Sequence, residues 1–222
     1  VGVKHYKSWT INGGNATSKK GIFKGKENKI LSITSDGSHY FTGVLDGNIY
    51  QFEGSAIKTA LKCHSRAVDS ISLSKKFVIS GGKDNLINLI DKRSMKVSQT
   101  IDLAKAGLDL SSPAIRAAYL SSDEKNIIVG TAGCEILQAS LSNTNAWEVL
   151  IRGHYGPCKK DTNEVWGLAV YPDGDQYVSC SDDGTLRVWS VSKKKMLKMI
   201  NLGLDDKGKK LPADSKTKEL NM

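Results

Sequence analysis

Apolar and polar residues alternate along short segments of this chain, and turn-forming residues separate the segments. The clearest example runs from His154 to Trp189. Its linkers contain Pro172-Asp173-Gly174 and Asp182-Asp183-Gly184, which are typical of tight turns because Pro fixes φ and Gly accepts positive φ. Three segments alternate with the period of two expected of half-buried strands: residues 164–170, 176–181 and 185–189.

The same pattern occurs three more times upstream of this stretch. Asp46 and Asp84 occupy corresponding turns 38 positions apart, which is a usual length for a repeated four-stranded unit. Residues 104–112 are expected to form a loop. The predicted strands are residues 30–34, 39–44, 48–52 and 57–61; 67–73, 77–82, 86–90 and 96–103; 114–120, 126–131, 135–139 and 147–151; and 196–202 in addition to the three above.

The stretch from His154 to Trp189 resembles the WD-repeat signature, which describes one blade of a β-propeller. The resemblance implies a chain of hydrogen bonds. Trp189 would donate to a serine hydroxyl, that hydroxyl would bond His154, and His154 would bond Asp183. A buried indole N–H needs such an acceptor, since an unpaired donor costs about 1–3 kcal/mol. Ser179 and Ser181 both fit, and the sequence does not choose between them.

The other repeats keep only part of this signature. Phe52 follows Asp46 by six positions, as Trp189 follows Asp183, so the aromatic is kept and the indole donor is lost. The next repeat has His64 and Asp84, with Ile90 at the aromatic position. The third is degenerate, because its turn at Ala132-Gly133 has no aspartate.

The N-terminal segment predicts a half blade. Residues 3–9 alternate and end in Trp9, residues 12–15 turn, and residues 20–23 are the expected return strand. The predicted fold is all-β: a partial β-propeller of about four and a half four-stranded antiparallel blades within residues 1–202. The predicted divisions are residues 1–24, 25–62, 63–112, 113–152 and 153–202, followed by a polar linker or tail at 203–222.

An open arc of blades leaves two end faces uncovered. The chain also does not begin with Met, so we read it as part of a longer chain. We therefore expect a parent of about seven blades whose further blades complete the propeller. A closed ring formed by these residues alone would contradict that expectation.

Charge adds a class of partner to this picture. The 222 residues carry a formal net charge of +9, and lysines greatly outnumber arginines. A basic surface suits an acidic partner, although solvated charge explains a lysine-rich surface equally well. Few arginines argue against base readout, so we expect no nucleic acid partner. The candidate contacts are Lys159, Lys160, Lys193, Lys194 and Lys195.

Other function classes are disfavoured. No apolar run approaches the length of a membrane span, and the N-terminus lacks a signal-peptide core. Cys63, Cys134, Cys158 and Cys180 show no metal-ligand spacing, so we expect no metal, no cofactor and reduced thiols.

A hydrolase triad could also use a histidine, a serine and an aspartate. Such a triad needs an exposed nucleophile, an oxyanion hole and a pocket. Here His154, the two serines and Asp183 stand at blade-signature spacing that ends in Trp189. That spacing favours a structural role, and we expect no catalytic residue and no enzyme.

Six short segments occur in a distinctive order along the chain: residues 2–5, 78–84, 114–116, 128–131, 153–154 and 164–169. In this order they resemble the echinoderm microtubule-associated protein-like family over nearly all of residues 1–202. The resemblance implies a cytoplasmic protein of the cytoskeleton whose propeller contacts tubulin. Residues 155–163 lengthen one family linker, and we read them as a tolerated surface loop rather than a binding loop. The alternative function is a general WD-repeat scaffold in a ligase or ciliary complex.

Overall fold

A computed structural model describes residues 6–21, 28–154, 165–172 and 174–202 of the chain. Contacts divide the chain into two compact units, Val1–Glu148 and Val149–Met222, and each is described by itself. The loop expected at residues 155–163, with Lys159 and Lys160, and the tail expected at 203–222 lie outside the described residues.

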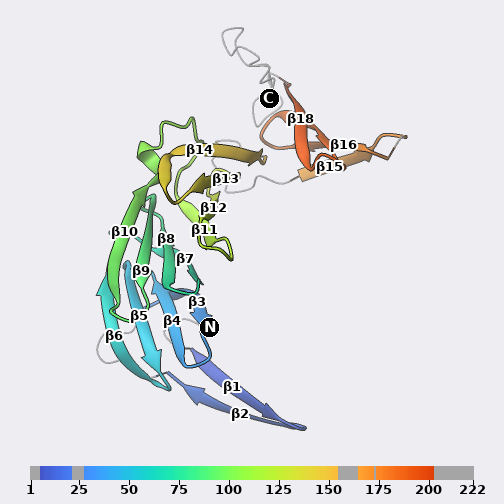
Figure 1. Ribbon diagram of the computed structural model, residues 1–222. Coiled ribbons are helices and arrows are strands. Elements are labelled where there is room, and N and C mark those ends of the chain that lie inside the picture. Colours follow the sequence, from blue (N-terminus) through green and yellow to red (C-terminus); the bar gives the residue numbers. More distant parts are fainter. Residues whose placement is uncertain (1–5, 22–27, 155–164, 173, 203–222) are drawn as a thin grey trace. The chain divides into compact units, whose positions relative to one another are not determined.

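The described residues form four four-stranded antiparallel sheets and one two-stranded sheet (Figure 1). In each four-stranded sheet the strands follow one another in sequence order, as the alternating pattern predicted. We number these sheets blades 1 to 4. Blade 1 is β3 (Ile30–Ser35), β4 (His39–Val44), β5 (Asn48–Glu53) and β6 (Ala56–Lys62); blade 2 is β7 (Val68–Leu73), β8 (Phe77–Gly82), β9 (Leu86–Asp91) and β10 (Lys96–Asp102).

The last two blades have the same strand order. Blade 3 is β11 (Ile115–Leu120), β12 (Asn126–Thr131), β13 (Glu135–Ser140) and β14 (Asn143–Arg152); blade 4 is β15 (Val165–Val170), β16 (Gln176–Ser181), β17 (Thr185–Ser190) and β18 (Lys195–Asn201). Within the loop predicted after blade 2, Leu103–Lys105 form a short 3-10 helix, which Asp102 caps by accepting from the Ala104 N–H.

The first predicted hairpin has its turn where expected, at residues 12–15, but its return strand was predicted too late in the chain. The strands are β1 (Lys7–Asn12) and β2 (Asn15–Lys20), whereas the expected return strand lay at residues 20–23, of which 22 and 23 are outside the described residues. Asn12 pairs with Asn15 across a two-residue turn, so the strands directly flank Gly13-Gly14. Residues 16–18 gave no strand signal, because every residue of β2 is exposed and none needs apolar alternation.

Tyr6 fixes the base of this hairpin to blade 1. Its ring is 1% exposed and packs edge-on against Phe52, with 4.7 Å between ring centroids. Its hydroxyl donates to the Gly54 carbonyl at 2.7 Å. Phe52, expected to keep the aromatic position of the blade, is fully buried in this cluster. Trp9 instead lies 60% exposed on β1.

The first strands of blades 1 to 3 stack beside one another, with β7 packed against both β3 and β11 (Figure 1). Phe41, Ile49, Val68, Ile71 and Val78 form the core between the first two of these blades. Burial of such side chains is the main stabilising term, at about 1.5–3 kcal/mol for each large one. A blade therefore depends on its neighbour for stability.

Polar contacts join the same strands. The Ser32 hydroxyl donates to the Val68 carbonyl at 3.0 Å, and the Ser72 hydroxyl donates to the Ala118 carbonyl at 2.6 Å. Blades 1 and 2 approach each other so closely that β4 needs a glycine, since a Cβ added at Gly43 would overlap Val68. Hydrogen bonds to the backbone and close backbone packing thus hold neighbouring blades together, in addition to the burial of apolar side chains.

Candidate functional site

The structure brings His154, Ser179, Asp183 and Trp189 together in blade 4. The Trp189 indole Nε1 donates to the Ser179 hydroxyl at 2.8 Å. The Ser179 oxygen lies 2.7 Å from His154 Nε2, and His154 Nδ1 lies 2.9 Å from an Asp183 carboxylate oxygen. Ser181 is outside this chain of bonds, and its hydroxyl accepts from the Asp183 N–H at 3.4 Å.

The chemistry of the end groups fixes the direction of two of these bonds. Because an indole N–H can only donate, Ser179 accepts from Trp189. Because an ionised carboxylate can only accept, His154 Nδ1 donates to Asp183. One hydrogen-bond network thus joins strands β16 and β17, the turn between them and the segment before β15.

Arg187 and Thr185 extend the network, and sequence reasoning did not identify either of them. Arg187 is only 4% exposed, and its guanidinium donates to Asp183 at 2.9 Å. It also donates to the carbonyls of Arg152 and Gly153. The Thr185 hydroxyl donates to Asp183 at 2.7 Å. The available signal was the alternation of Thr185 and Arg187 with apolar residues, which places both on one face of β17.

Asp183 stays ionised despite its burial. Desolvation acts to raise the pKa of its carboxyl group, but donation from Thr185 and His154 outweighs that effect and holds the pKa below its usual value. Asp84 in blade 2 behaves in the same way. Burial opposes its ionisation, while bonds from His64 and the Ser65 N–H lower its pKa.

Blade 2 contains a second histidine network. His64 Nδ1 lies 2.9 Å from Asp84, and His64 Nε2 lies 2.9 Å from the Ser80 hydroxyl. Ile90 occupies the tryptophan position and is fully buried. Asn88 occupies the position that corresponds to Arg187. Its amide donates to the Cys63 carbonyl at 3.0 Å. Ser80 was not singled out from sequence, although it precedes Asp84 by four positions as Ser179 precedes Asp183.

Blade 3 replaces the network with a glutamate. The buried Glu135 carboxylate accepts from the Thr131 hydroxyl and from the Ser111 N–H, the latter at 2.9 Å. A Cβ added at Gly133 would lie 2.5 Å from this carboxylate. The carboxylate therefore fills the space of the missing turn aspartate from two positions further along the chain, which a signature search does not detect.

Blade 1 leaves the network unfilled among the described residues. Asp46 is exposed, and its carboxylate accepts from the Asn48 N–H at 3.0 Å. Thr42 stands where the other blades have Ser80 and Ser179, and its hydroxyl is buried without a hydrogen-bond partner. The sequence from Gly21 to Ser38 contains no histidine, so it has no imidazole to bond Thr42 as His64 and His154 bond the serines of blades 2 and 4.

The remaining chemistry within the described residues is limited. They contain no cluster of histidine, cysteine and carboxylate side chains that could hold a metal ion. Burial raises the pKa of the Cys63 thiol to about 11, which keeps it protonated at neutral pH. Cys134 and Cys180 are also free thiols, and Cys158 lies outside the described residues. None of the described helical segments is long and apolar enough to cross a membrane.

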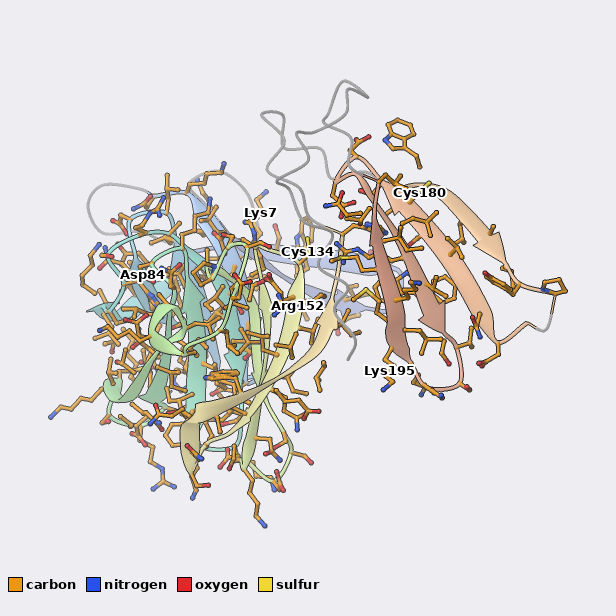
Figure 2. The ribbon with its side chains drawn as sticks, turned by 90° about the horizontal axis from the view of Figure 1, so that it is seen from above. Lys7, Asp84, Cys134, Arg152, Cys180 and Lys195 are labelled. Atoms are coloured by element: carbon orange, nitrogen blue, oxygen red, sulfur yellow. The ribbon has the colours of Figure 1, made fainter. Side chains whose placement is uncertain are left out.

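Three of the five lysines proposed as partner contacts lie within the described residues. Lys193, Lys194 and Lys195 are exposed at the turn between β17 and β18, and Lys195 marks the start of β18 in Figure 2. They are far along the chain from the histidine of their blade, at the end of the sheet opposite the Asp183 turn. The buried networks and the exposed lysines are therefore separate features of the molecule.

Comparison with known proteins identifies two repeats in this chain. The family model described as WD domain, G-beta repeat matches residues 54–91 and 149–190. The ciliary WD repeat-containing protein ctxp80 of Euplotoides octocarinatus is 25% identical over 95% of this chain and 27% of its own length. Human echinoderm microtubule-associated protein-like 2 is 28% identical over 85% of this chain and 28% of its own length.

A plant protein is also among the relatives. Autophagy-related protein 16 of Arabidopsis thaliana is 26% identical over 83% of this chain and 34% of its own length. The chain thus spans about a quarter to a third of the length of these curated relatives.

Proposed function

Because this chain is a WD-repeat protein homologous to the echinoderm microtubule-associated protein-like proteins, we propose that it is a non-catalytic binding platform for tubulin. The observation that carries the proposal is the match to those relatives over 85% of the chain. Further blades of the parent protein complete the propeller, and the protein acts in the cytoplasm on the cytoskeleton.

The geometry of the networks supports a structural role over catalysis. Ser179 is 5% exposed, and its hydroxyl accepts from Trp189 while it bonds His154. A nucleophile that is buried and already bonded to an indole and an imidazole has no access to substrate. A serine-directed activity probe should therefore leave this protein unlabelled, and labelling at Ser179 would overturn the non-catalytic assignment.

The charge of the chain supports an acidic protein partner. The formal net charge is +9, and Lys193 to Lys195 are exposed together at one turn. Acidic surfaces attract such a protein at long range and raise the rate of encounter. Tubulin has acidic surfaces and tails, and it is the subunit of the microtubules that the relatives' names mention. It therefore fits both those relatives and the positive charge of this chain.

Co-sedimentation tests the proposal directly. The full-length protein should pellet with assembled microtubules and should remain in the supernatant without them. Failure of the full-length protein to pellet, and failure to bind unassembled tubulin in a pull-down, would contradict the function.

A second candidate is a scaffold within a larger assembly, such as a ciliary complex or a ligase. The relative from Euplotoides octocarinatus, which is named as ciliary, favours it. Affinity capture separates the two candidates. A stable complex recovered without tubulin supports the scaffold, whereas tubulin as the main recovered protein supports the first proposal.

A further inference from the structure

Blade 2 carries a cluster of cations at one end of its sheet. Lys75 and Lys76 occupy the β7–β8 turn, Lys92 and Arg93 occupy the β9–β10 turn, and Lys96 begins β10. The Lys92 N–H donates to the Lys76 carbonyl at 3.0 Å, so the two turns are held together. We name these five residues the basic turn cluster. Four of them are exposed and Lys92 is partly buried.

The side chains of the cluster form no direct ion pair. Among the described residues, none of the five lies within ion-pair distance of a carboxylate. The neighbouring carboxylates bond to the turns: Asp91 accepts from the Ser94 N–H and hydroxyl, both at 2.8 Å, and Glu124 accepts from the Lys76 N–H at 2.9 Å. Hydrogen bonds lower the pKa of both carboxyl groups, so they stay ionised and offset part of the positive charge. The five cations still outnumber the acids beside them.

Blade 4 repeats this arrangement at the corresponding turn. Lys193, Lys194 and Lys195 are exposed between β17 and β18. Asp175 accepts from the Ser192 N–H at 2.9 Å and from the Ser190 hydroxyl at 3.2 Å, so a carboxylate again supports the turn beneath the lysines.

The fold itself does not require these cations. The β5–β6 turn of blade 1, Gly54-Ser55, and the β13–β14 turn of blade 3, Leu141-Ser142, are two residues long and contain no cation. A blade can therefore close this connection with a shorter turn and without lysine. Cations gathered at one end of a sheet repel one another, and an acidic ligand between them would relieve that repulsion.

We propose that the basic turn cluster is a docking surface for an extended, glutamate-rich peptide segment, and that the lysines of blade 4 form a second contact of the same kind. This inference rests on the proposed function and specifies which surface meets the acidic partner. Lysine ammonium groups attract a string of carboxylates as point charges and need no fixed register. Four of the five cluster residues are lysines, which fits a flexible acidic segment better than base readout.

The test compares two double variants of the full-length protein that change charge equally. Lys75→Glu with Arg93→Glu reverses two exposed residues of the cluster. Lys62→Glu with Arg66→Glu reverses two exposed residues beside the opposite end of blade 2 and serves as the control. The probe is a fluorescently labelled synthetic glutamate-rich peptide, read by anisotropy. The cluster variant should bind at least about tenfold more weakly, and the control should stay within about twofold of the wild type.

Equal weakening by both variants would overturn the docking surface, because it would indicate general charge attraction. Unchanged binding by the cluster variant would overturn it as well. A cluster variant that loses binding to a labelled single-stranded RNA but keeps the peptide would assign the surface to nucleic acid instead. Wild-type pelleting with microtubules is measured in parallel. If the wild type pellets and the cluster variant pellets equally well, the docking surface is wrong while the proposed function stands.

Discussion

The buried hydroxyl of Thr42 is the clearest cost that a single residue imposes on this fold. It occupies the serine position of the network, and no described group satisfies it. Replacing an unsatisfied buried hydroxyl by a methyl group of the same shape removes a desolvation cost without opening a cavity. Thr42→Val should therefore raise the free energy of unfolding by about 1 kcal/mol, measured by thermal or urea unfolding.

Thr131 provides the matched control for this prediction. Its hydroxyl donates to Glu135 and accepts from the Glu135 N–H at 3.1 Å, so it is fully used. Thr131→Val would take the hydroxyl donor from Glu135, a residue that is 2% exposed, and leave its carboxylate with the Ser111 N–H. The same substitution should here lower the free energy of unfolding by about 2–3 kcal/mol. Equal effects at the two positions would show that hydrogen bonding does not decide either one.

Sequence reasoning identified some network residues and not others for a physical reason. Asp183 and Trp189 follow a spacing that the turn between β16 and β17 imposes, and His154 was found from its place ahead of the first strand of the blade. Glu135 and Arg187 reach the same location from other positions by means of longer side chains. A fixed spacing finds a residue type at a position, whereas packing selects any side chain that delivers the required group to the required point.

At the scale of the element, the indole and the serine of blade 4 should act as a unit. Ser179→Ala removes the acceptor of Trp189 and the partner of His154 Nε2, and should cost about 2–3 kcal/mol of stability. Trp189→Phe removes the donor that Ser179 satisfies. The double variant should be less destabilised than the sum of the two single variants, by about 0.5–3 kcal/mol in a double-mutant cycle. Additive single effects would mean that the indole bond contributes nothing.

The two turn aspartates should also make stability depend on pH. Their pKa values are lower in the folded state than in the unfolded chain, where a free aspartate titrates near about 3.9. The folded state therefore binds fewer protons, and this part of the stability is complete above the unfolded pKa. It is lost as pH falls through the lower folded pKa. The melting temperature should decline steeply on acidification below about pH 4.

The variant Asp84→Asn isolates the contribution of blade 2. It should be less stable at neutral pH, because His64 Nδ1 loses a charged acceptor. Its melting temperature should decline less on acidification, since one of the two titrating groups is gone. An acid transition of unchanged slope would assign the pH dependence to other carboxylates.

The strands of the four blades could be predicted from sequence because alternation reports burial on one face. His39–Val44, Phe77–Gly82, Asn126–Thr131 and Gln176–Ser181 have the predicted bounds. The return strand of the first hairpin was predicted too late in the chain because β2 is exposed along its whole length, so burial leaves no pattern in its residues. The anchoring of that hairpin by Tyr6 could not be predicted either, since it depends on contact with Phe52 in another sheet.

At the scale of the whole molecule, the decisive quantity is the distribution of charge. The net charge of +9 predicts attraction to an acidic partner, but it does not say whether that attraction is diffuse or local. The structure offers a local candidate, since exposed lysines gather at the same end of the sheet in blade 2 and in blade 4. A local cluster and a diffuse field respond differently when the same number of charges is removed from different places.

Ionic strength turns this difference into a measurement. Screening shortens the range of exposed charges to about 10 Å at 0.1 M salt, so binding of the full-length protein to microtubules should weaken at least about tenfold between about 50 and 250 mM NaCl. Lys75→Glu with Arg93→Glu should flatten this dependence, because fewer contacting charges remain to be screened. Lys62→Glu with Arg66→Glu lowers the net charge equally and should keep the wild-type slope. Binding that is indifferent to salt would place the contact on an apolar surface, and equal flattening by both variants would make the attraction a property of the whole chain rather than of its turns.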